Sequence, residues 1–166
     1  DDKKIVLGVS STWVKSKGLE DFSALANILP KEYQVVLVGL SKDQISALPS
    51  NIIGVERTDS VQELAELYTA ATVFVNPTYE DNYPTTNLEA IACGTPVVTY
   101  RTGGSAEIVE KSGMGFIVNQ RDIIGLKNAV LEADEKVYHL LNLYELCSQE
   151  YAFEKYIELY SDILKN

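Results

Sequence analysis

The sequence predicts a single α/β domain, with a parallel sheet of about six strands covered by helices on both faces. Two observations support this prediction. Short apolar segments alternate with helical patterns along the 166 residues, and these segments are continuous rather than alternating in polarity. Continuous apolar runs are typical of parallel strands that are buried on both faces. Regular alternation of strands and helices indicates βαβ units with right-handed crossovers, and hence a doubly wound, Rossmann-like sheet.

Six segments are predicted as strands and five as helices. The predicted strands are Ile5–Val9, Val35–Val38, Ile52–Val55, Val73–Val75, Val97–Tyr100 and Phe116–Val118. The predicted helices are Leu19–Leu29, Ser60–Ala71, Thr86–Cys93, Ser105–Lys111 and Ile123–Ala133. The last segment, Val137 to Leu164, is expected to form one or two helices that close the domain or pack on a part of the protein outside this sequence. Its tyrosines are interpreted as packing residues, among them Tyr151, Tyr156 and Tyr160.

Composition and charge narrow the range of partners. Acidic residues outnumber basic ones, 24 to 14, which gives a net charge of −10. Nucleic acid is not an expected partner because binding to a phosphate backbone needs a basic surface. A small phosphate ligand is compatible with this charge, since a few local donors can hold it. No apolar run approaches the roughly 20 residues of a transmembrane helix, and Cys93 and Cys147 are expected to be reduced, so a cytoplasmic location is predicted.

Several kinds of site lack their sequence signatures. The only histidine is His139, which argues against a histidine-based metal site and a Ser-His-Asp triad. No Asp-x-Asp pair is present to hold a divalent metal, and neither GxGxxG nor GxxxxGK[ST] occurs. A phospho-acceptor receiver domain needs an aspartate at a central strand end, where this sequence has Ser10, Gly39 and Asn76. No metal or cofactor is therefore expected.

The segment from Asn76 to Val98 is the candidate functional site. A predicted strand is followed by a polar loop, a short helix and a second buried strand. Ligands of doubly wound sheets bind at the carboxyl ends of the strands, and a helix N-terminus at that edge favours anions. A purely structural interpretation is also open: Thr86-x-x-Glu89 has the pattern of a capping box, in which the two side chains bond the first turn of the helix.

This segment resembles the signature of the group 1 glycosyltransferases, which are retaining enzymes with the two-domain GT-B fold. The family signature is Glu-x7-Glu, followed by Ala, a helix of small residues and Gly-x-Pro-Val, and residues 88–98 match its second half almost residue for residue. The resemblance extends in order from Ile5 to about Ala133. It includes Gly8, Lys17-Gly18, Thr102-Gly103-Gly104-x-x-Glu107-Ile108-Val109 and Gly115-Phe116-Ile117-Val118.

The signature departs from the family pattern at its first acid. Asp81 stands eight residues before Glu89 and is preceded by Glu80, so either Asp81 or Glu80 could fill the first acidic role. Residues 82–84, Asn-Tyr-Pro, replace the usual Gly-Phe-Gly. The family's arginine after the first strand has no counterpart, so its phosphate contact is either missing or passed to Lys15.

The resemblance implies specific roles for three residues. Glu89 would accept hydrogen bonds from the ribose hydroxyls of a nucleotide-diphosphate sugar donor. Asp81 would hold hydroxyls of the transferred sugar, and Lys17 would neutralise the diphosphate leaving group without a metal. The other residues assigned to donor binding are Glu80, Asn82, Thr85, Thr86, Asn87, Gly103, Gly104, Lys15, Arg57 and Thr58.

Some of these assignments have a structural alternative. The backbone N–H groups near Thr85, Thr86 and Asn87 would cradle the diphosphate. Gly103 and Gly104 would bring the backbone close to the ligand, although a tight strand-to-helix turn accounts for them almost as well. Arg57 and Thr58 follow the third strand, where the family places the base. Glu107 is interpreted as a first-turn carboxylate favoured by the helix dipole, and Trp13 either stacks on a ligand or covers the core.

The sequence therefore predicts that residues 1–166 form the donor-binding domain of a retaining glycosyltransferase of bacterial surface polysaccharide synthesis. The acceptor-binding N-terminal domain would lie outside this sequence, together with any peripheral membrane association. The domain alone is expected to bind nucleotide weakly and to transfer nothing. A sugar-nucleotide epimerase with the same fold and a non-catalytic nucleotide-binding module are the alternatives, and the base, sugar and acceptor are left open.

Overall fold

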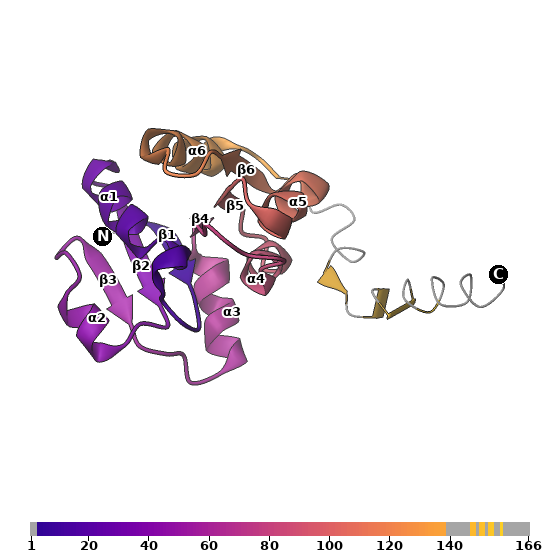
Figure 1. Cartoon of the computed structure of the whole chain (residues 1–166), viewed down its shortest axis with the longest axis horizontal. Coiled ribbons are helices and arrows are strands. Elements are labelled where there is room, and N and C mark those ends of the chain that lie inside the picture. The colour runs from indigo at the N-terminus through magenta and orange to yellow at the C-terminus, as the bar shows by residue number, and fades with distance from the viewer. Residues whose placement is uncertain (1–2, 139–146, 149, 152, 155–156, 158–166) are drawn as a thin grey trace.

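The computed structural model describes residues 3–138, 147, 148, 150, 151, 153, 154 and 157. It contains a six-stranded parallel sheet in the order β3-β2-β1-β4-β5-β6 (Figure 1), which confirms the predicted doubly wound α/β class. The strands are β1 (Lys4–Val9), β2 (Tyr33–Val38), β3 (Ile52–Val55), β4 (Val73–Asn76), β5 (Val97–Tyr100) and β6 (Gly115–Val118). All six predicted strands are confirmed, with ends displaced by two residues at most.

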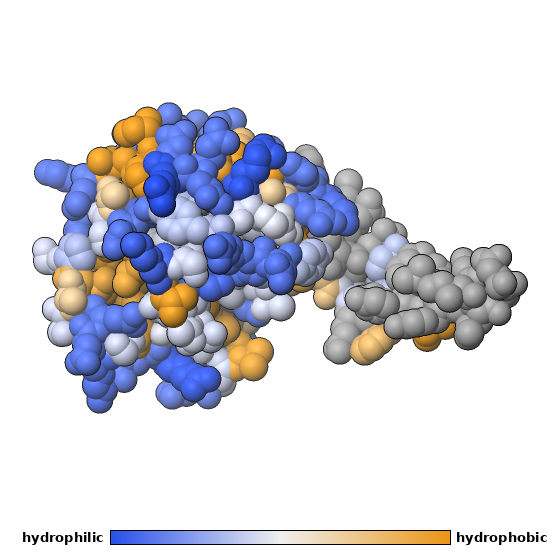
Figure 2. Space-filling view, in the orientation of Figure 1, coloured by the Kyte–Doolittle hydropathy of each residue, from blue (hydrophilic) through white to orange (hydrophobic). Residues whose placement is uncertain are grey.

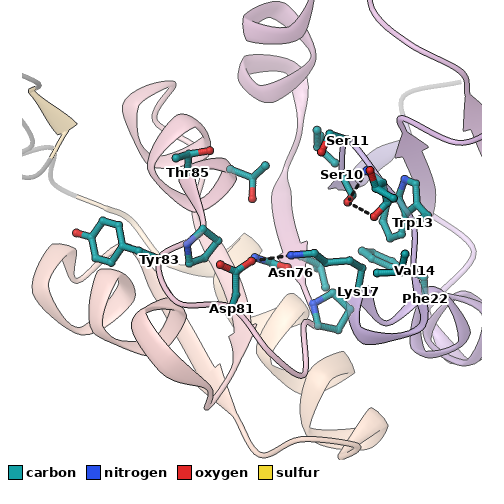
Figure 3. A pocket seen from close by; sticks show the side chains of 16 residues that line it. Ser10, Ser11, Trp13, Val14, Lys17, Phe22, Asn76, Asp81, Tyr83 and Thr85 are labelled. Atoms are coloured by element: carbon teal, nitrogen blue, oxygen red, sulfur yellow. Dashed lines mark hydrogen bonds and ion pairs between the residues drawn. The ribbon is translucent and has the colours of Figure 1, made fainter.

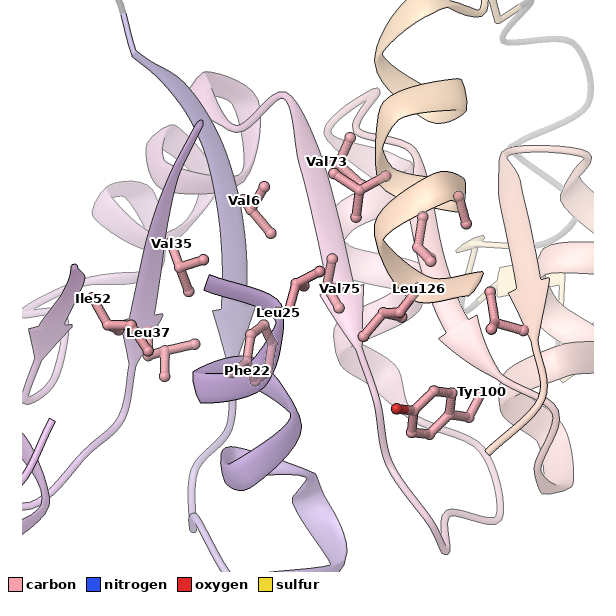
Figure 4. Close-up of a cluster of buried hydrophobic side chains, with 14 of the residues drawn as sticks. Val6, Phe22, Leu25, Val35, Leu37, Ile52, Val73, Val75, Tyr100 and Leu126 are labelled. Atoms are coloured by element: carbon pink, nitrogen blue, oxygen red, sulfur yellow. The ribbon is translucent and has the colours of Figure 1, made fainter. Parts of the chain in front are cut away.

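Helices cover both faces of the sheet. They are α1 (Leu19–Ile28), α2 (Lys42–Ser46), α3 (Val61–Ala70), α4 (Thr85–Ala92), α5 (Gly103–Ser112) and α6 (Ile123–Glu135), with a short 3₁₀ turn, η1 (Lys15–Lys17). On one face, Phe22 and Leu25 of α1 and Leu126 of α6 pack over the sheet with Val6 and Val75 (Figure 4). Helices α3, α4 and α5 cover the opposite face, so the central strands β1, β2, β4 and β5 are buried on both sides as their continuous apolar sequences predict. The edge strand β3 leaves Ile53 half-exposed.

The strand order places a topological switch point between β1 and β4. From β1 the chain moves outward through β2 to β3, and then crosses back to β4 before continuing to β5 and β6. The loops that follow β1 and β4 therefore leave the sheet in opposite directions. A crevice at the carboxyl ends of these two strands is the usual ligand site of doubly wound sheets.

Two structural interpretations of residues near helix starts are wrong. Helix α4 begins at Thr85 with Pro84 at its N-cap and no side-chain cap, so Thr86 and Glu89 do not form a capping box. Helix α5 begins two residues earlier than predicted, which places Glu107 beyond its first turn. Glu107 is instead paired with Lys111 one turn further along α5. Neither α2 nor η1 was predicted, although α2 carries a capping box formed by Ser41 and Gln44.

Other expectations concern the surface and the C-terminal region. Hydrophilic residues predominate on the face drawn in Figure 2, and apolar residues form small separate groups. Cys93 and Cys147 are free thiols, as predicted. Within the part of the chain that the structure describes, no helix combines the length and apolar character needed to cross a bilayer. His139, Tyr156, Tyr160 and most of the predicted C-terminal helices lie outside the described residues.

Candidate functional site

A cavity of about 340 Å³ lies at the carboxyl ends of β1 and β4 (Figure 3). One wall is the loop after β1, and the other is the loop after β4 together with the first turn of α4. Its lining residues include Ser10, Ser11, Thr12, Trp13, Val14, Lys17, Asn76, Pro77, Asp81, Tyr83, Pro84, Thr85 and Thr86. The structure thus brings the sequence motif that contains Asp81 to the switch point of the sheet.

A second cavity of about 560 Å³ adjoins the first. The two share lining residues at the end of β1 and at the start of α4, namely Val9, Ser10, Ser11, Thr85 and Thr86. The second cavity extends past the ends of β2 and β3, where Arg57 and Thr58 line it, and along α4 to Glu89. Together the two cavities form one groove along the carboxyl edge of the sheet, with the N-terminus of α4 at its middle.

Lys17 and Asp81 form an ion pair in the lining of the smaller cavity. Their Nζ and Oδ2 atoms are 2.7 Å apart (Figure 3), and the side chains are 30% and 17% exposed. Gly18 permits this approach because its φ is +72° and a β-carbon there would lie 2.3 Å from the carbonyl oxygen of Pro77. The N–H of Tyr79 also donates to the carbonyl of Ser16 at 2.8 Å. The two loops are therefore joined through their backbones, with opposite charges at the contact.

The linings of the two cavities distinguish the two candidates for the first acid of the motif, Asp81 and Glu80. Asp81 lines the smaller cavity, whereas the neighbouring Glu80 is exposed and lines neither cavity. Lys15 is exposed on η1 and also lies outside both linings. Of the basic residues near the β1 loop, Lys17 is the one that reaches into the groove.

Gly103 and Gly104 lie against the backbone of the loop that carries Asp81. Gly103 has a φ of +41°, and a β-carbon on it would lie 2.1 Å from the carbonyl oxygen of Asp81. The N–H of Gly104 donates to the carbonyl of Asn82 at 2.9 Å. The close approach at these glycines is therefore to the motif loop itself, and Asn82, Gly103 and Gly104 lie outside the linings of both cavities.

The N-terminus of α4 offers free donors to the groove. Its N-cap residue, Pro84, supplies no side-chain acceptor, so the first N–H groups of the helix lack the usual capping partner. Thr85 and Thr86, which carry these groups, line both cavities. The next N–H, that of Asn87, is bound to the Pro84 carbonyl at 3.2 Å. Unpaired donors and the positive end of the helix dipole are the features that favour an anion at a helix terminus.

The side chain of Asn87 is buried beneath this terminus. Its Oδ1 accepts from Asn76 at 2.8 Å, and its Nδ2 donates to Ser105 at 2.9 Å. Asn87 therefore supports α4 from within the protein and does not line either cavity. Because the sequence shows only a polar residue on a short helix, it cannot distinguish such a support from a ligand contact.

Glu89 lies half-buried in the wall of the larger cavity. Its Oε2 accepts a hydrogen bond from the hydroxyl of Tyr68 on α3 at 3.0 Å. Burial, together with the nearby Glu89 carboxylate, raises the pKa of Tyr68, so this hydroxyl stays protonated and remains a donor. No donor among the described residues occupies Oε1 of Glu89. Sequence analysis missed Tyr68 because no motif relates α3 to α4.

Trp13 belongs to the core as well as to the cavity wall. It is 8% exposed, and its indole N–H donates to the carbonyl of Val38 at 2.9 Å. Its ring meets that of Phe22 edge-on, with centroids 5.7 Å apart. Trp13 therefore covers the core. Because it also lines the smaller cavity, its stacking on a ligand stays a prediction. Among the described residues, no three His, Cys, Asp or Glu side chains are grouped so that they could hold a metal ion.

Comparison with known proteins agrees with this architecture. The family model "Glycosyl transferases group 1" matches residues 3–135. The chain belongs to the group 1 glycosyltransferases. The resemblance predicted from the sequence is thereby confirmed, and the fold corresponds to one Rossmann-like half of a GT-B enzyme.

Individual relatives of this glycosyltransferase chain include two curated bacterial enzymes. It is 28% identical over 180 aligned positions to the N,N'-diacetylbacillosaminyl-diphospho-undecaprenol alpha-1,3-N-acetylgalactosaminyltransferase of Campylobacter jejuni, covering 100% of this chain and 46% of the relative. It is 44% identical over 62 residues to the D-inositol 3-phosphate glycosyltransferase of Geodermatophilus obscurus, covering 37% and 14% of the two chains. The glycosyltransferase chain thus spans less than half the length of these relatives.

Solved structures share its fold. Sucrose-phosphate synthase from Thermosynechococcus elongatus superposes with a TM-score of 0.79 at 28% identity, covering 99% of this chain and 46% of that one. HepE from Anabaena, solved in complex with UDP, gives a TM-score of 0.73 at 20% identity and covers 99% and 49%. In both, the glycosyltransferase chain matches about half of a larger structure.

Proposed function

We propose that this chain is the donor-binding domain of a retaining glycosyltransferase that uses a nucleotide-diphosphate sugar. The observation that carries the proposal is the arrangement of the groove. Two cavities meet at the uncapped N-terminus of α4, with the Lys17–Asp81 pair in the smaller one and Glu89 in the wall of the larger one. A nucleotide sugar has the same order of parts, with a diphosphate between a nucleoside and a sugar.

The larger cavity fits the nucleoside. Glu89 has one oxygen held by Tyr68, and its Oε1 would accept hydrogen bonds from the ribose hydroxyls. Arg57 and Thr58 line the far end of this cavity, where they would face the base. The Tyr68 hydrogen bond fixes the carboxylate before the ligand arrives, which reduces the ordering needed on binding.

The diphosphate would lie at the start of α4. The N–H groups of Thr85 and Thr86 and the ammonium of Lys17 would neutralise it. As the bond to the sugar breaks, negative charge grows on this leaving group, and donors already in place stabilise that charge. Asp81 would accept hydrogen bonds from the hydroxyls of the sugar and orient it for transfer.

The remainder of the reaction would depend on a further domain. Because the chain covers 46% of the C. jejuni relative, we propose that the acceptor site is supplied by a second, N-terminal domain. The C. jejuni relative is named for an undecaprenol-diphosphate-linked acceptor, which supports a role in bacterial surface polysaccharide synthesis. The 166-residue chain alone is then expected to bind nucleotide weakly and to transfer nothing, and transfer of a radiolabelled sugar by the purified chain would contradict this expectation.

Calorimetry with UDP and GDP tests donor binding directly. Glu89→Ala should lower the affinity for whichever nucleotide the wild type binds by about tenfold or more, since it removes charge-assisted hydrogen bonds. Glu66→Ala is the matched control, because Glu66 lies on α3 outside the groove and accepts a bond from Gln62. Failure of the wild-type chain to bind either nucleotide would overturn the proposal.

A second test addresses transfer in the full-length protein. Glu89→Ala should abolish sugar transfer while the circular dichroism spectrum and melting temperature stay close to those of the wild type. Normal turnover by this variant would contradict the assignment of Glu89 to the donor site. An epimerised nucleotide sugar formed from a labelled donor without an acceptor would instead identify an epimerase.

A further inference from the structure

A buried carboxylate lies behind the smaller cavity. Asp21, in the first turn of α1, is 9% exposed and forms no part of the cavity lining. Its Oδ2 accepts two hydrogen bonds, from the hydroxyl of Tyr79 at 2.6 Å and from that of Tyr100 at 2.8 Å. A buried carboxylate with two hydroxyl donors is a strong hydrogen-bond centre, because charge-assisted bonds gain strength where water is excluded.

The partners of Asp21 belong to different elements of the groove. Tyr79 lies in the loop after β4, two residues before Asp81, whereas Tyr100 is the last residue of β5. Asp21 itself follows Lys17 by four residues, at the start of the helix that η1 leads into. One carboxylate thus connects the element that bears the cation with the loop that bears the facing acid.

The backbone of Tyr79 is held as firmly as its side chain. Its carbonyl accepts from the hydroxyl of Thr102 and from the amide of Gln120, each at 3.0 Å. Its ring lies against that of Tyr100, with centroids 5.8 Å apart, and under the guanidinium of Arg121 at 5.6 Å. Burial, followed by the hydrogen bond to Asp21, raises the pKa of Tyr79, which keeps the hydroxyl protonated.

We propose that Asp21 is a positioning residue of the donor site: through the hydroxyl of Tyr79 it fixes the loop that places Asp81 opposite Lys17. This inference rests on the proposed function, since it assigns to Asp21 the alignment of the residue that would hold the transferred sugar. Asp21 does not touch the groove. Asp21 would affect binding indirectly, because its hydrogen bond to Tyr79 sets the position of Asp81.

The test compares binding of a nucleotide with binding of the corresponding sugar nucleotide. The probes are UDP with UDP-N-acetylgalactosamine and GDP with GDP-mannose, titrated calorimetrically into the 166-residue chain, and the pair that the wild type binds is used for the variants. Tyr79→Phe removes only the hydroxyl that reaches Asp21. It should lower the affinity for the sugar nucleotide about tenfold. The affinity for the nucleoside diphosphate should stay within about twofold of the wild-type value, because Glu89 and the start of α4 are unchanged. Asp21→Ala should shift this affinity ratio in the same direction.

Tyr100→Phe is the matched control for stability. It removes the second bond to the same carboxylate, but from a sheet strand rather than from the loop that carries Asp81. It should lower the melting temperature and leave the affinity ratio at the wild-type value. A normal ratio in Tyr79→Phe, or an equal shift in Tyr100→Phe, would overturn the positioning role while nucleotide binding by the wild type still supported the proposed function. Absence of nucleotide binding by the wild type would overturn both.

Discussion

At the scale of single residues, the Lys17–Asp81 pair separates ligand binding from stability. The pair is close, at 2.7 Å, but both side chains are in contact with solvent. Partly exposed ion pairs contribute little to folding, because solvent screens the attraction and two flexible side chains must be ordered. The value of Lys17 therefore lies in the charge that it presents to the groove.

Substitution of Lys17→Met should therefore affect binding more than folding. We expect the free energy of unfolding to fall by less than about 1 kcal/mol, and the affinity for the bound nucleoside diphosphate to fall at least about tenfold. Chemical denaturation and calorimetry measure the two quantities. Lys15→Met is the control, since Lys15 is exposed and lies outside both cavities. An equal loss of affinity in the Lys15 variant would show that the lysine at position 17 has no special role.

At the scale of secondary-structure elements, helix α4 is anchored by a ring of buried polar groups. Asn87 on α4 bonds Asn76 of β4 and Ser105 of α5. The ring is completed by Thr99 of β5, which lies 2.6 Å from Ser105 and donates to the carbonyl of Asn76 at 2.8 Å. Satisfied buried networks restrict motion strongly. The helix whose N-terminus opens on the groove is thus held by three neighbouring elements, β4, β5 and α5.

Two glycines at the ends of helix α5 provide a matched pair for a test of the motif loop. Both have positive φ, +41° at Gly103 and +66° at Gly113. A β-carbon at Gly103 would meet the carbonyl oxygen of Asp81 at 2.1 Å, whereas a β-carbon at Gly113 would have no atom within 4 Å. Gly113→Ala should cost about 1 kcal/mol from the left-handed backbone alone and leave nucleotide binding unchanged.

Gly103→Ala should cost more, on the order of 2–4 kcal/mol, because the motif loop must move to accept the methyl group. It should also weaken sugar-nucleotide binding, since that loop carries Asp81. Denaturation and calorimetry on the two variants decide the matter. Equal stability losses and equal affinities would show that the loop accommodates a side chain at residue 103 without displacement.

The element scale also shows which parts of the site the sequence could predict. Between residues 3 and 138, every strand and five of the six α-helices followed from apolar runs and helical patterns, and the motif loop was located correctly at the sheet edge. The start of α4 was displaced because Pro84, rather than Thr86, is its N-cap. Helix α2 was missed because five residues give too short a pattern. The contacts of Asn87, Tyr68 and Asp21 depend on side chains far apart in sequence, which periodicity does not relate.

At the scale of the whole molecule, one acid connects the two ends of the described domain. Asp134 of α6 accepts hydrogen bonds from Lys4 of β1 and from Tyr33 of β2, both at 2.6 Å. Burial by itself raises the pKa of Asp134, but the bonds from Lys4 and Tyr33 outweigh it and hold the pKa below the ordinary value of 3.8. Helix α6 is thereby bound to the first two strands.

This contact predicts a pH dependence of stability. A carboxyl group whose pKa is lower in the folded than in the unfolded protein stabilises the fold above its ordinary pKa, and this contribution is lost as the pH falls through the folded value. Asp134→Asn should lower the free energy of unfolding at pH 7 by on the order of 1 kcal/mol. The difference from the wild type should shrink below about pH 4. Asp43→Asn, on the surface of α2, is the control, and a difference that does not change with pH would contradict the prediction.

The shared wall between the two cavities has a consequence for turnover. Under the proposed function, the bond that breaks lies beside the start of α4, where the smaller cavity ends and the larger one begins. Once the sugar has left, the spent nucleoside diphosphate still has the whole larger cavity, the helix terminus and Lys17. The nucleoside diphosphate product should therefore leave slowly and compete with fresh donor. The turnover rate would then depend on the cellular ratio of nucleotide sugar to free nucleoside diphosphate.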